Sequence, residues 1–371
     1  MCASRPPPWE KICSARKVFF RNSWGLLGPD GELRYCARRM VKNLDISALA
    51  EAVLSQDRRA LARAITLAES TRPDHRAQAE ALLATLPVPD VPSVRLGITG
   101  APGVGKSTFI EAFGNHLTSH GRRVAVLAVD PTSSRSGGSI LGDKTRMAVL
   151  SRDPNAFIRP TPAGHSLGGV ARRTREAMTL VEAAGFDVTI VETVGVGQSE
   201  YSVADMVDMF LLLVAPGGGD ELQGIKRGIM ELADLLVVNK ADGALAKAAC
   251  GAAAEYQNAL HLMRPRMSWW KVEVLMASAL QGAGLPEIWR RVEDFQKKLE
   301  EQSGPKYNRA AQARRWLWEE IQDDLMAAIK SDSDIAPLIA AREEQVSRQE
   351  ITPSAAAREI LDKFLMRPFK P

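Results

Sequence analysis

The chain has 371 residues, 45% of them hydrophobic and 25% charged, which is enough to bury the core of one large domain or of two smaller ones. No apolar run is long enough to span a bilayer, which argues against a membrane protein. The four cysteines form no C-x-x-C pair, which argues against a structural zinc site and favours a reducing, cytoplasmic compartment. The formal charge of +4 is uneven: residues 1–42 hold nine Lys/Arg and three Asp/Glu, a net +6, which leaves −2 for the rest and does not suit a nucleic-acid-binding surface.

Residues 1–42 show no regular periodicity and include the run Pro6-Pro7-Pro8. We predict a poorly ordered extension, or a start assigned too early, since Met40 lies just before the first regular pattern. An organelle transit peptide is the alternative, because the segment is rich in arginine and poor in acidic residues.

The next segment, residues 43–92, is predicted to form two or three helices rich in Ala and Leu, followed by a Pro-rich linker at 86–92. Asp57 or Ser55 is expected to cap the second helix, and Pro73 to lie in the first turn of the third.

From Val94 onward strand and helix patterns alternate, which predicts an α/β domain over residues 93–304 with a mostly parallel sheet and helices on both faces. The expected strands are 94–99, 123–129, 156–159, 187–192, 208–214, 234–239 and 272–276, and the expected helices include 106–120, 169–184, 222–231, 244–263 and 285–301. Residues 305–371 are predicted to add a C-terminal helical segment, with helices at 306–330 and 353–365.

The first strand leads into a stretch that fits G-x-x-x-x-G-K-[ST], the phosphate-binding loop. The stretch reads Gly100-Ala101-Pro102-Gly103-Val104-Gly105-Lys106-Ser107-Thr108. Backbone N–H groups of such a loop converge on phosphate oxygens, and the helix that follows directs its positive end at the same anion. Lys106 is expected to reach the β- and γ-phosphates and the Ser107 hydroxyl to bind Mg²⁺. The fold class predicted is therefore a P-loop NTPase with helical extensions at both ends.

The second motif, Asn239-Lys240-Ala241-Asp242, follows the strand pattern at 234–239 and has the form N-K-x-D that reads guanine. The Asp242 carboxylate can accept from guanine N1–H and the 2-amino group, whereas adenine has neither donor there, so GTP and GDP are the expected ligands. Asn239 is expected to hold the loop together and the Lys240 stem to pack along the base. The loop Ser278-Ala279-Leu280 follows the next strand, and its Ala279 N–H is a candidate donor to guanine O6.

Three carboxylates, Asp130, Asp143 and Glu192, are the candidates to serve Mg²⁺ and the attacking water alongside Lys106. Asp130 and Glu192 each end a strand pattern, and Glu192 opens Glu-Thr-Val-Gly, where small GTPases usually have Asp. The Gly195 N–H is expected to sense the γ-phosphate. Val196 replaces the water-positioning Gln of the Ras type, so slow unaided hydrolysis is predicted.

A glycine-rich loop at 216–226 follows the strand pattern at 208–214, and its three consecutive glycines indicate mobility. Four side chains after these glycines are candidates to contact nucleotide or a partner: Asp220, Glu221, Gln223 and Lys226.

Four longer stretches make the sequence similar to the MeaB/ArgK family of P-loop GTPases, the group of the methylmalonic aciduria type A protein, and most similar to MeaB. They are 129–133 (VDPTS), 137–147 (GGSILGDKTRM), 191–200 (VETVGVGQSE) and 219–226 (GDELQGIK), and the resemblance covers about residues 44–365.

The resemblance implies a GTPase chaperone that gates adenosylcobalamin loading of methylmalonyl-CoA mutase, or of a related acyl-CoA mutase, and protects it. It also implies a homodimer with contacts from the C-terminal helices. Asp130, Asp143 and Glu192 match positions near Mg²⁺ or switch segments, and residues 215–226 match a third switch that includes Lys226. Relatives that sandwich nucleotides between two subunits carry an extra Lys just after the first Gly of the phosphate loop. Ala101 occupies that position here, so a lysine that acts on the nucleotide of the other subunit is not expected.

A metal-inserting GTPase of the nickel type is the alternative function. Such proteins carry His-rich tails or Cys/His pairs, whereas Cys250 is the only cysteine after residue 42 and no His-rich tract occurs. A nucleotide-dependent kinase would need a second substrate pocket, for which the sequence offers no candidate.

Overall fold

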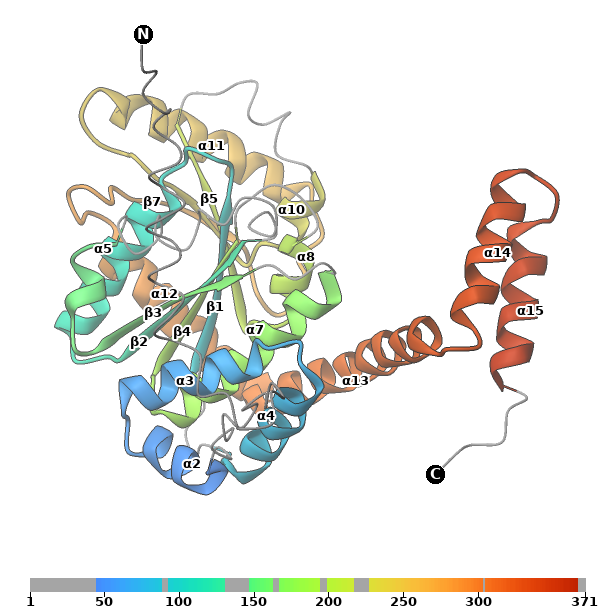
Figure 1. The fold of residues 1–371 in the computed structure, drawn as a ribbon. Helices are drawn as coiled ribbons and strands as arrows, with labels where there is room; N and C mark the ends of the chain where they lie inside the picture. Colours follow the sequence, from blue (N-terminus) through green and yellow to red (C-terminus); the bar gives the residue numbers. More distant parts are fainter. Residues whose placement is uncertain are drawn as a thin grey trace, which may run out of the picture. The chain divides into compact units, whose positions relative to one another are not determined.

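The computed structural model describes residues 45–88, 93–130, 147–162, 167–193, 199–216, 227–302 and 304–365. The elements from Ile46 onward belong to one compact unit. Its centre is a sheet of seven strands in the order β3-β2-β4-β1-β5-β6-β7, in which every neighbouring pair is parallel (Figure 1). The strands are β1 (Val94–Gly100), β2 (Val124–Asp130), β3 (Ala156–Pro162), β4 (Val188–Thr193), β5 (Met209–Val214), β6 (Leu235–Val238) and β7 (Glu273–Met276). The predicted parallel α/β fold is thereby confirmed.

Helices cover both faces of the sheet (Figure 1). α5 (Lys106–Ser119) and α12 (Leu285–Gln302) pack together on one face, and α7 (Leu167–Ala183), α8 (Ser199–Ala204), α10 (Arg227–Leu232) and α11 (Ala246–His261) lie on the other. Two 3₁₀ turns, η1 (Leu150–Arg152) and η2 (Gly243–Leu245), lie in the connections.

Strand β5 illustrates why the central strands are apolar throughout. Leu211 and Leu213 belong to the core that α5 and α12 cover, whereas Leu212 and Val214 belong to the core under α10 and α11. Because successive side chains of a strand point to opposite faces, a strand covered on both sides must be apolar at every position. All six residues of β5 are buried.

The N-terminal helices α2 (Ile46–Leu54), α3 (Arg58–Ala68) and α4 (Pro73–Thr85) pack against one another and against α7. Asp57 caps α3: its Oδ1 accepts from the N–H groups of Arg59 and Ala60, both at 2.7 Å. Pro73 begins α4, where its missing N–H costs no hydrogen bond. These two features were predicted from the sequence and are confirmed.

The C-terminal segment forms α13 (Gly304–Ser331), α14 (Ala336–Ser347) and α15 (Pro353–Leu365). α13 is joined to the sheet through Asp208, which is completely buried before β5. Arg309 donates from Nη2 to Asp208 Oδ2 at 2.7 Å and from Nε to Oδ1 at 3.2 Å. The sequence did not predict α14, which buries none of its side chains and so carries little amphipathic signal.

We expect Arg309→Met to lower the free energy of unfolding by about 3–5 kcal/mol, because the substitution leaves the Asp208 carboxylate buried without its cation. Urea denaturation would measure the change. Arg315→Met is the matched control on the same helix, since Arg315 and Asp205 form an exposed pair at 3.4 Å whose loss should cost at most about 1 kcal/mol. Equal effects of the two substitutions would contradict the anchoring role of Arg309.

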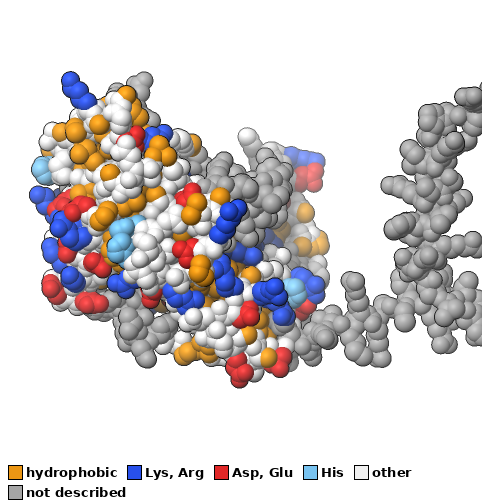
Figure 2. All heavy atoms as spheres, turned by 90° about the vertical axis from the view of Figure 1, so that its left-hand side faces the viewer, with side chains coloured by type: hydrophobic (Ala, Val, Ile, Leu, Met, Phe, Trp, Pro, Cys, Tyr) orange, Lys and Arg blue, Asp and Glu red, His pale blue; other side chains and the backbone are white. Residues whose placement is uncertain are grey.

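Figure 2 shows one face of the molecule, on which Lys/Arg and Asp/Glu side chains are interspersed rather than gathered by sign. Among the helices that the structure describes, none has the length and apolar character needed to cross a membrane.

Candidate nucleotide-binding site

The turn between β1 and α5 lies at the centre of the sheet, because β1 has β4 on one side and β5 on the other. Gly100 ends β1 with a φ of 154°, and a Cβ there would lie 2.4 Å from the carbonyl oxygen of Leu213. Gly105 is the N-cap of α5 in the left-handed conformation, with a φ of 91°. Both positions therefore require glycine, which explains two of the fixed residues of the motif. The loop opens toward the carboxyl ends of the strands, where ligands of such sheets bind.

Lys106 begins α5 and folds back over the loop. Its Nζ donates to the carbonyl oxygens of Gly100 at 2.6 Å and Ala101 at 3.2 Å. Burial lowers the pKa of this amine, and the nearby carboxylates of Glu192 and Glu200 act in the opposite direction. A partly buried ammonium group held by carbonyl oxygens is well placed to gain from an added anion at the loop.

Ser107 and Glu192 bring two oxygen-bearing side chains together. The Ser107 hydroxyl donates to Glu192 Oε1 at 3.2 Å, although the two residues are 85 positions apart. The parallel register pairs Glu192 of β4 with Ile98 of β1, and the Thr193 hydroxyl donates to the Thr99 hydroxyl at 2.7 Å. The ends of β1 and β4 are therefore held side by side, with Glu192 next to the start of α5.

A cleft of about 230 Å³ lies beyond the loop, at the carboxyl ends of β6 and β7. Its lining residues are Gly105, Thr108, Asn239, Lys240, Asp242, Leu245, Ala279 and Leu280. The two motif side chains tie it to the phosphate loop: Asn239 Nδ2 donates to Val104 O at 3.0 Å, and Lys240 Nζ donates to Gly103 O at 2.7 Å. Asn239 also accepts from the Ala279 N–H at 3.4 Å.

The Asp242 carboxylate is held at the cleft by Ser278, which is completely buried. The Ser278 hydroxyl donates to Asp242 Oδ2 and accepts from the Gln281 N–H at 3.1 Å. Within the described residues Asp242 Oδ1 has no hydrogen-bond donor, so the oriented carboxylate retains accepting capacity for a ligand.

The structure brings most of the predicted site residues to this edge of the sheet. The backbone of Asp130 ends β2, the strand next to β4. Asp143, Gly195 and the four candidates of the glycine-rich loop, Asp220, Glu221, Gln223 and Lys226, lie outside the described residues. No group of three His, Cys, Asp or Glu side chains that could hold a metal ion occurs in the part of the chain that is described.

Leu245 lines the cleft and was not predicted as a site residue. It ends η2, the short 3₁₀ turn that follows Asp242 directly. The sequence signal was its position three residues after the motif aspartate, since one helical turn returns a side chain to the same side. Leu245 adds apolar surface beside Leu280, which is 81% exposed at the lip of the cleft.

A phosphate loop at the centre of a parallel sheet, joined by hydrogen bonds to a cleft that presents an oriented carboxylate, defines a P-loop nucleoside triphosphatase. The family model described as "Methylmalonyl Co-A mutase-associated GTPase MeaB" matches residues 61–334. The chain therefore belongs to the MeaB family, and it is a GTPase, as the sequence predicted.

Individual relatives agree with this assignment. A protein of Caulobacter vibrioides named "Putative GTPase" is 54% identical over 325 residues, which cover 88% of this chain and 99% of that protein. The mouse "Methylmalonic aciduria type A homolog, mitochondrial" is 46% identical, over 84% of this chain and 77% of its own length. Among solved structures, "Crystal structure of LAO/AO transport system kinase" is similar with a TM-score of 0.69 and 36% identity, over 88% of this chain and all of that one.

Proposed function

We propose that this GTPase is a chaperone of an adenosylcobalamin-dependent acyl-CoA mutase, chiefly methylmalonyl-CoA mutase, and that GTP binding and hydrolysis gate loading of the cofactor and protection of the enzyme. The observation that carries the proposal is the cleft lined by Asn239, Lys240 and Asp242, here called the guanine-type cleft, which is joined to the phosphate loop. The description of the chain's family names association with this mutase. The name of the mouse relative supports the same partner.

The residues assigned to GTP and GDP are the loop from Gly100 to Thr108, Gly195, the motif residues Asn239, Lys240 and Asp242, and the segment 278–280. Lys106 is assigned to the transferring phosphate, with Asp130, Asp143 and Glu192 at the metal and the water. Mg²⁺ fits the described part of this set, because the Ser107 hydroxyl and the Glu192 carboxylate are oxygen ligands that already lie 3.2 Å apart. When bound, the ion would neutralise charge on the phosphates.

Unaided GTP hydrolysis by this protein should be slow and should rise when the mutase binds. The motivation is Val196, which follows Gly195 where Ras-type enzymes have the water-positioning Gln. A partner that orders the site lowers the barrier by about 1.4 kcal/mol for each tenfold gain in rate. Phosphate release at saturating GTP, with and without saturating mutase, measures the effect. A rate that does not respond to the mutase would count against the proposal.

The glycine-rich loop is proposed to transmit the state of the nucleotide to the mutase. Lys226→Ala should leave GTP affinity and unaided hydrolysis within a few-fold of the parent and remove most of the mutase-stimulated increment, a coupling of about 1–3 kcal/mol. Hydrolysis rates measured at increasing mutase concentrations separate the unaided rate from the mutase-stimulated increment. If Lys226→Ala reduces unaided hydrolysis as severely as Lys106→Ala, Lys226 acts in catalysis instead.

We further propose a cytoplasmic homodimer in which the C-terminal segment, residues 305–371, contributes to the subunit contact. In support, α13 exposes the apolar side chains of Leu317, Trp318 and Met326, and α15 exposes Leu365. We also propose the following division of the preceding chain: an N-terminal extension at residues 1–42, a helical segment with a linker at 43–92, and the GTPase domain at 93–304. The metal-inserting alternative has no specific observation in its favour among the described residues.

A further inference from the structure

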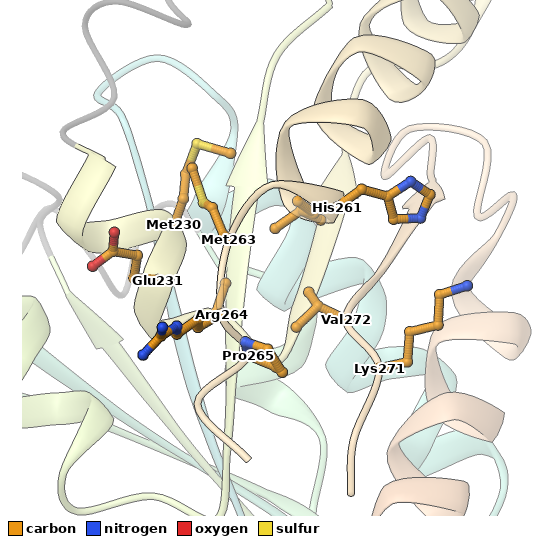
Figure 3. A pocket seen from close by; sticks show the side chains of 10 residues that line it. Met230, Glu231, His261, Met263, Arg264, Pro265, Lys271 and Val272 are labelled. Atoms are coloured by element: carbon orange, nitrogen blue, oxygen red, sulfur yellow. The ribbon is translucent and has the colours of Figure 1, made fainter. Parts of the chain in front are cut away.

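A second cleft, of about 190 Å³, lies between α10 and the segment that connects α11 to β7 (Figure 3). Ala233, just before β6, and Val272, just before β7, contribute to its wall. The cleft is therefore at the amino ends of these two strands, whereas the guanine-type cleft is at their carboxyl ends. It is not part of the nucleotide site.

The inner wall of this cleft is apolar. Met230 and Ala233 are buried, and Met263 and Val272 are half-buried. The cleft encloses about 190 Å³. A space of this size suits one apolar side chain of another protein, and anchor residues of protein interfaces occupy such pockets.

The rim of the cleft is charged, with an excess of basic groups. Arg264 and Lys271 are exposed, and neither has a hydrogen bond or an ion pair within the described residues. Figure 3 shows that His261 and Lys271 extend to one side of the cleft, and Arg264 and Glu231 to the other. Leu262, next to this rim, is 86% exposed. The rim is complementary to a partner with an acidic residue beside its apolar anchor.

Helix α10 connects this cleft to the nucleotide side of the domain. It contributes Met230 and Glu231 to the cleft, and it packs against α8 through Gly228, where a Cβ would lie 2.1 Å from the hydroxyl of Tyr201. α8 in turn contacts β1 and β4, the strands that carry the phosphate loop and Glu192. A protein bound in the cleft would therefore touch a helix that packs, through α8, against the strands that carry the phosphate loop and Glu192.

We propose that the cleft is a docking site for the mutase partner, and that it receives an apolar side chain flanked by an acidic residue of that protein. The inference rests on the proposed function for the identity of the partner. The site itself follows from the apolar wall, from the two cations that have no partner among the described residues, and from the position of α10.

The test measures the affinity of the full-length protein for purified methylmalonyl-CoA mutase by calorimetry, with GTP at saturation. Lys271→Glu should weaken binding at least tenfold, because it places a negative charge against the acidic residue of the partner. Met263→Asp, which makes the wall polar, should have an effect at least as large. Lys297→Glu is the matched control, since it makes the same change of charge at an exposed position on α12. Thermal unfolding of each variant verifies the fold, and Lys271→Glu alone suffices if Met263→Asp does not fold.

The outcomes are distinct. Selective loss of affinity in Lys271→Glu, with Lys297→Glu within twofold of the parent, supports the docking site. Unchanged affinity in Lys271→Glu, or an equal loss in Lys297→Glu, overturns the docking site and leaves the proposed function in place. A parent protein that does not bind the mutase overturns the partner and the docking site together.

Discussion

Replacing Lys106 with alanine should lower the rate of GTP hydrolysis by about a hundred- to a thousand-fold, because it removes the positive charge that we assign to the transferring phosphate. The structure adds a reason for a large effect: the Lys106 ammonium group lies at the phosphate loop, where it donates to the carbonyls of Gly100 and Ala101. Phosphate release under saturating GTP would measure the loss.

Two controls make this result interpretable. Lys247→Ala removes the same charge from an exposed position on α11 and should leave the rate unchanged. Lys106→Arg keeps the charge and should still lose most of the activity, because a planar guanidinium cannot take the place of a compact ammonium group in the loop. Hydrolysis by Lys106→Ala at the parent rate would show that the phosphate-loop assignment is wrong.

The second large effect concerns the choice of base. Asp242→Asn should weaken GTP binding by about 3–6 kcal/mol, or roughly a hundred- to ten-thousand-fold, because neither hydrogen bond then has a charged acceptor and the amide donor opposes the 2-amino group of guanine. The amide can donate to the 2-oxygen of xanthine, so xanthosine triphosphate should bind the variant better than GTP does. Calorimetric titration with GTP, ATP and xanthosine triphosphate would compare the three.

Ser278→Ala provides the graded control for Asp242. It removes the hydroxyl that orients the carboxylate but retains the charge, so GTP affinity should fall by about tenfold and the order of preference should stay the same. Equal affinity of the parent protein for ATP and GTP would contradict the role of Asp242 as the guanine-reading residue.

Much of the fold was predictable because its signals are local. The apolar runs of the parallel strands, the Pro and Asp at helix starts and the two nucleotide motifs each depend on a few neighbouring residues. The hydrogen bonds of Asn239 and Lys240 to Val104 and Gly103 join residues more than 130 positions apart, and only the order of the strands brings them together.

The parts that were not predicted depend on packing rather than on pattern. The bond between Arg309 and Asp208 places a charged pair at the base of the sheet, where the sequence shows only an exposed-looking arginine in a helix. No residue of α14 is buried, so the sequence of this helix shows no apolar face by which it could be predicted. The cleft beside α10 is formed by the end of α10, the end of α11 and the loop before β7. Residues of α10 and α11 that line it are about 30 positions apart in the sequence.

The hydrogen bonds from Asn239 and Lys240 to the phosphate loop have a thermodynamic consequence. Because these side chains line the cleft that holds Asp242 and donate to carbonyls of the loop, we expect that fixing one part of the site also fixes the other. The binding free energy of an intact guanine nucleotide should therefore exceed the sum for guanosine and tripolyphosphate measured separately, even after the entropy of joining them is subtracted. The surplus should shrink in Asn239→Ala and disappear when Lys240→Ala is added, because both hydrogen bonds to the loop are then lost.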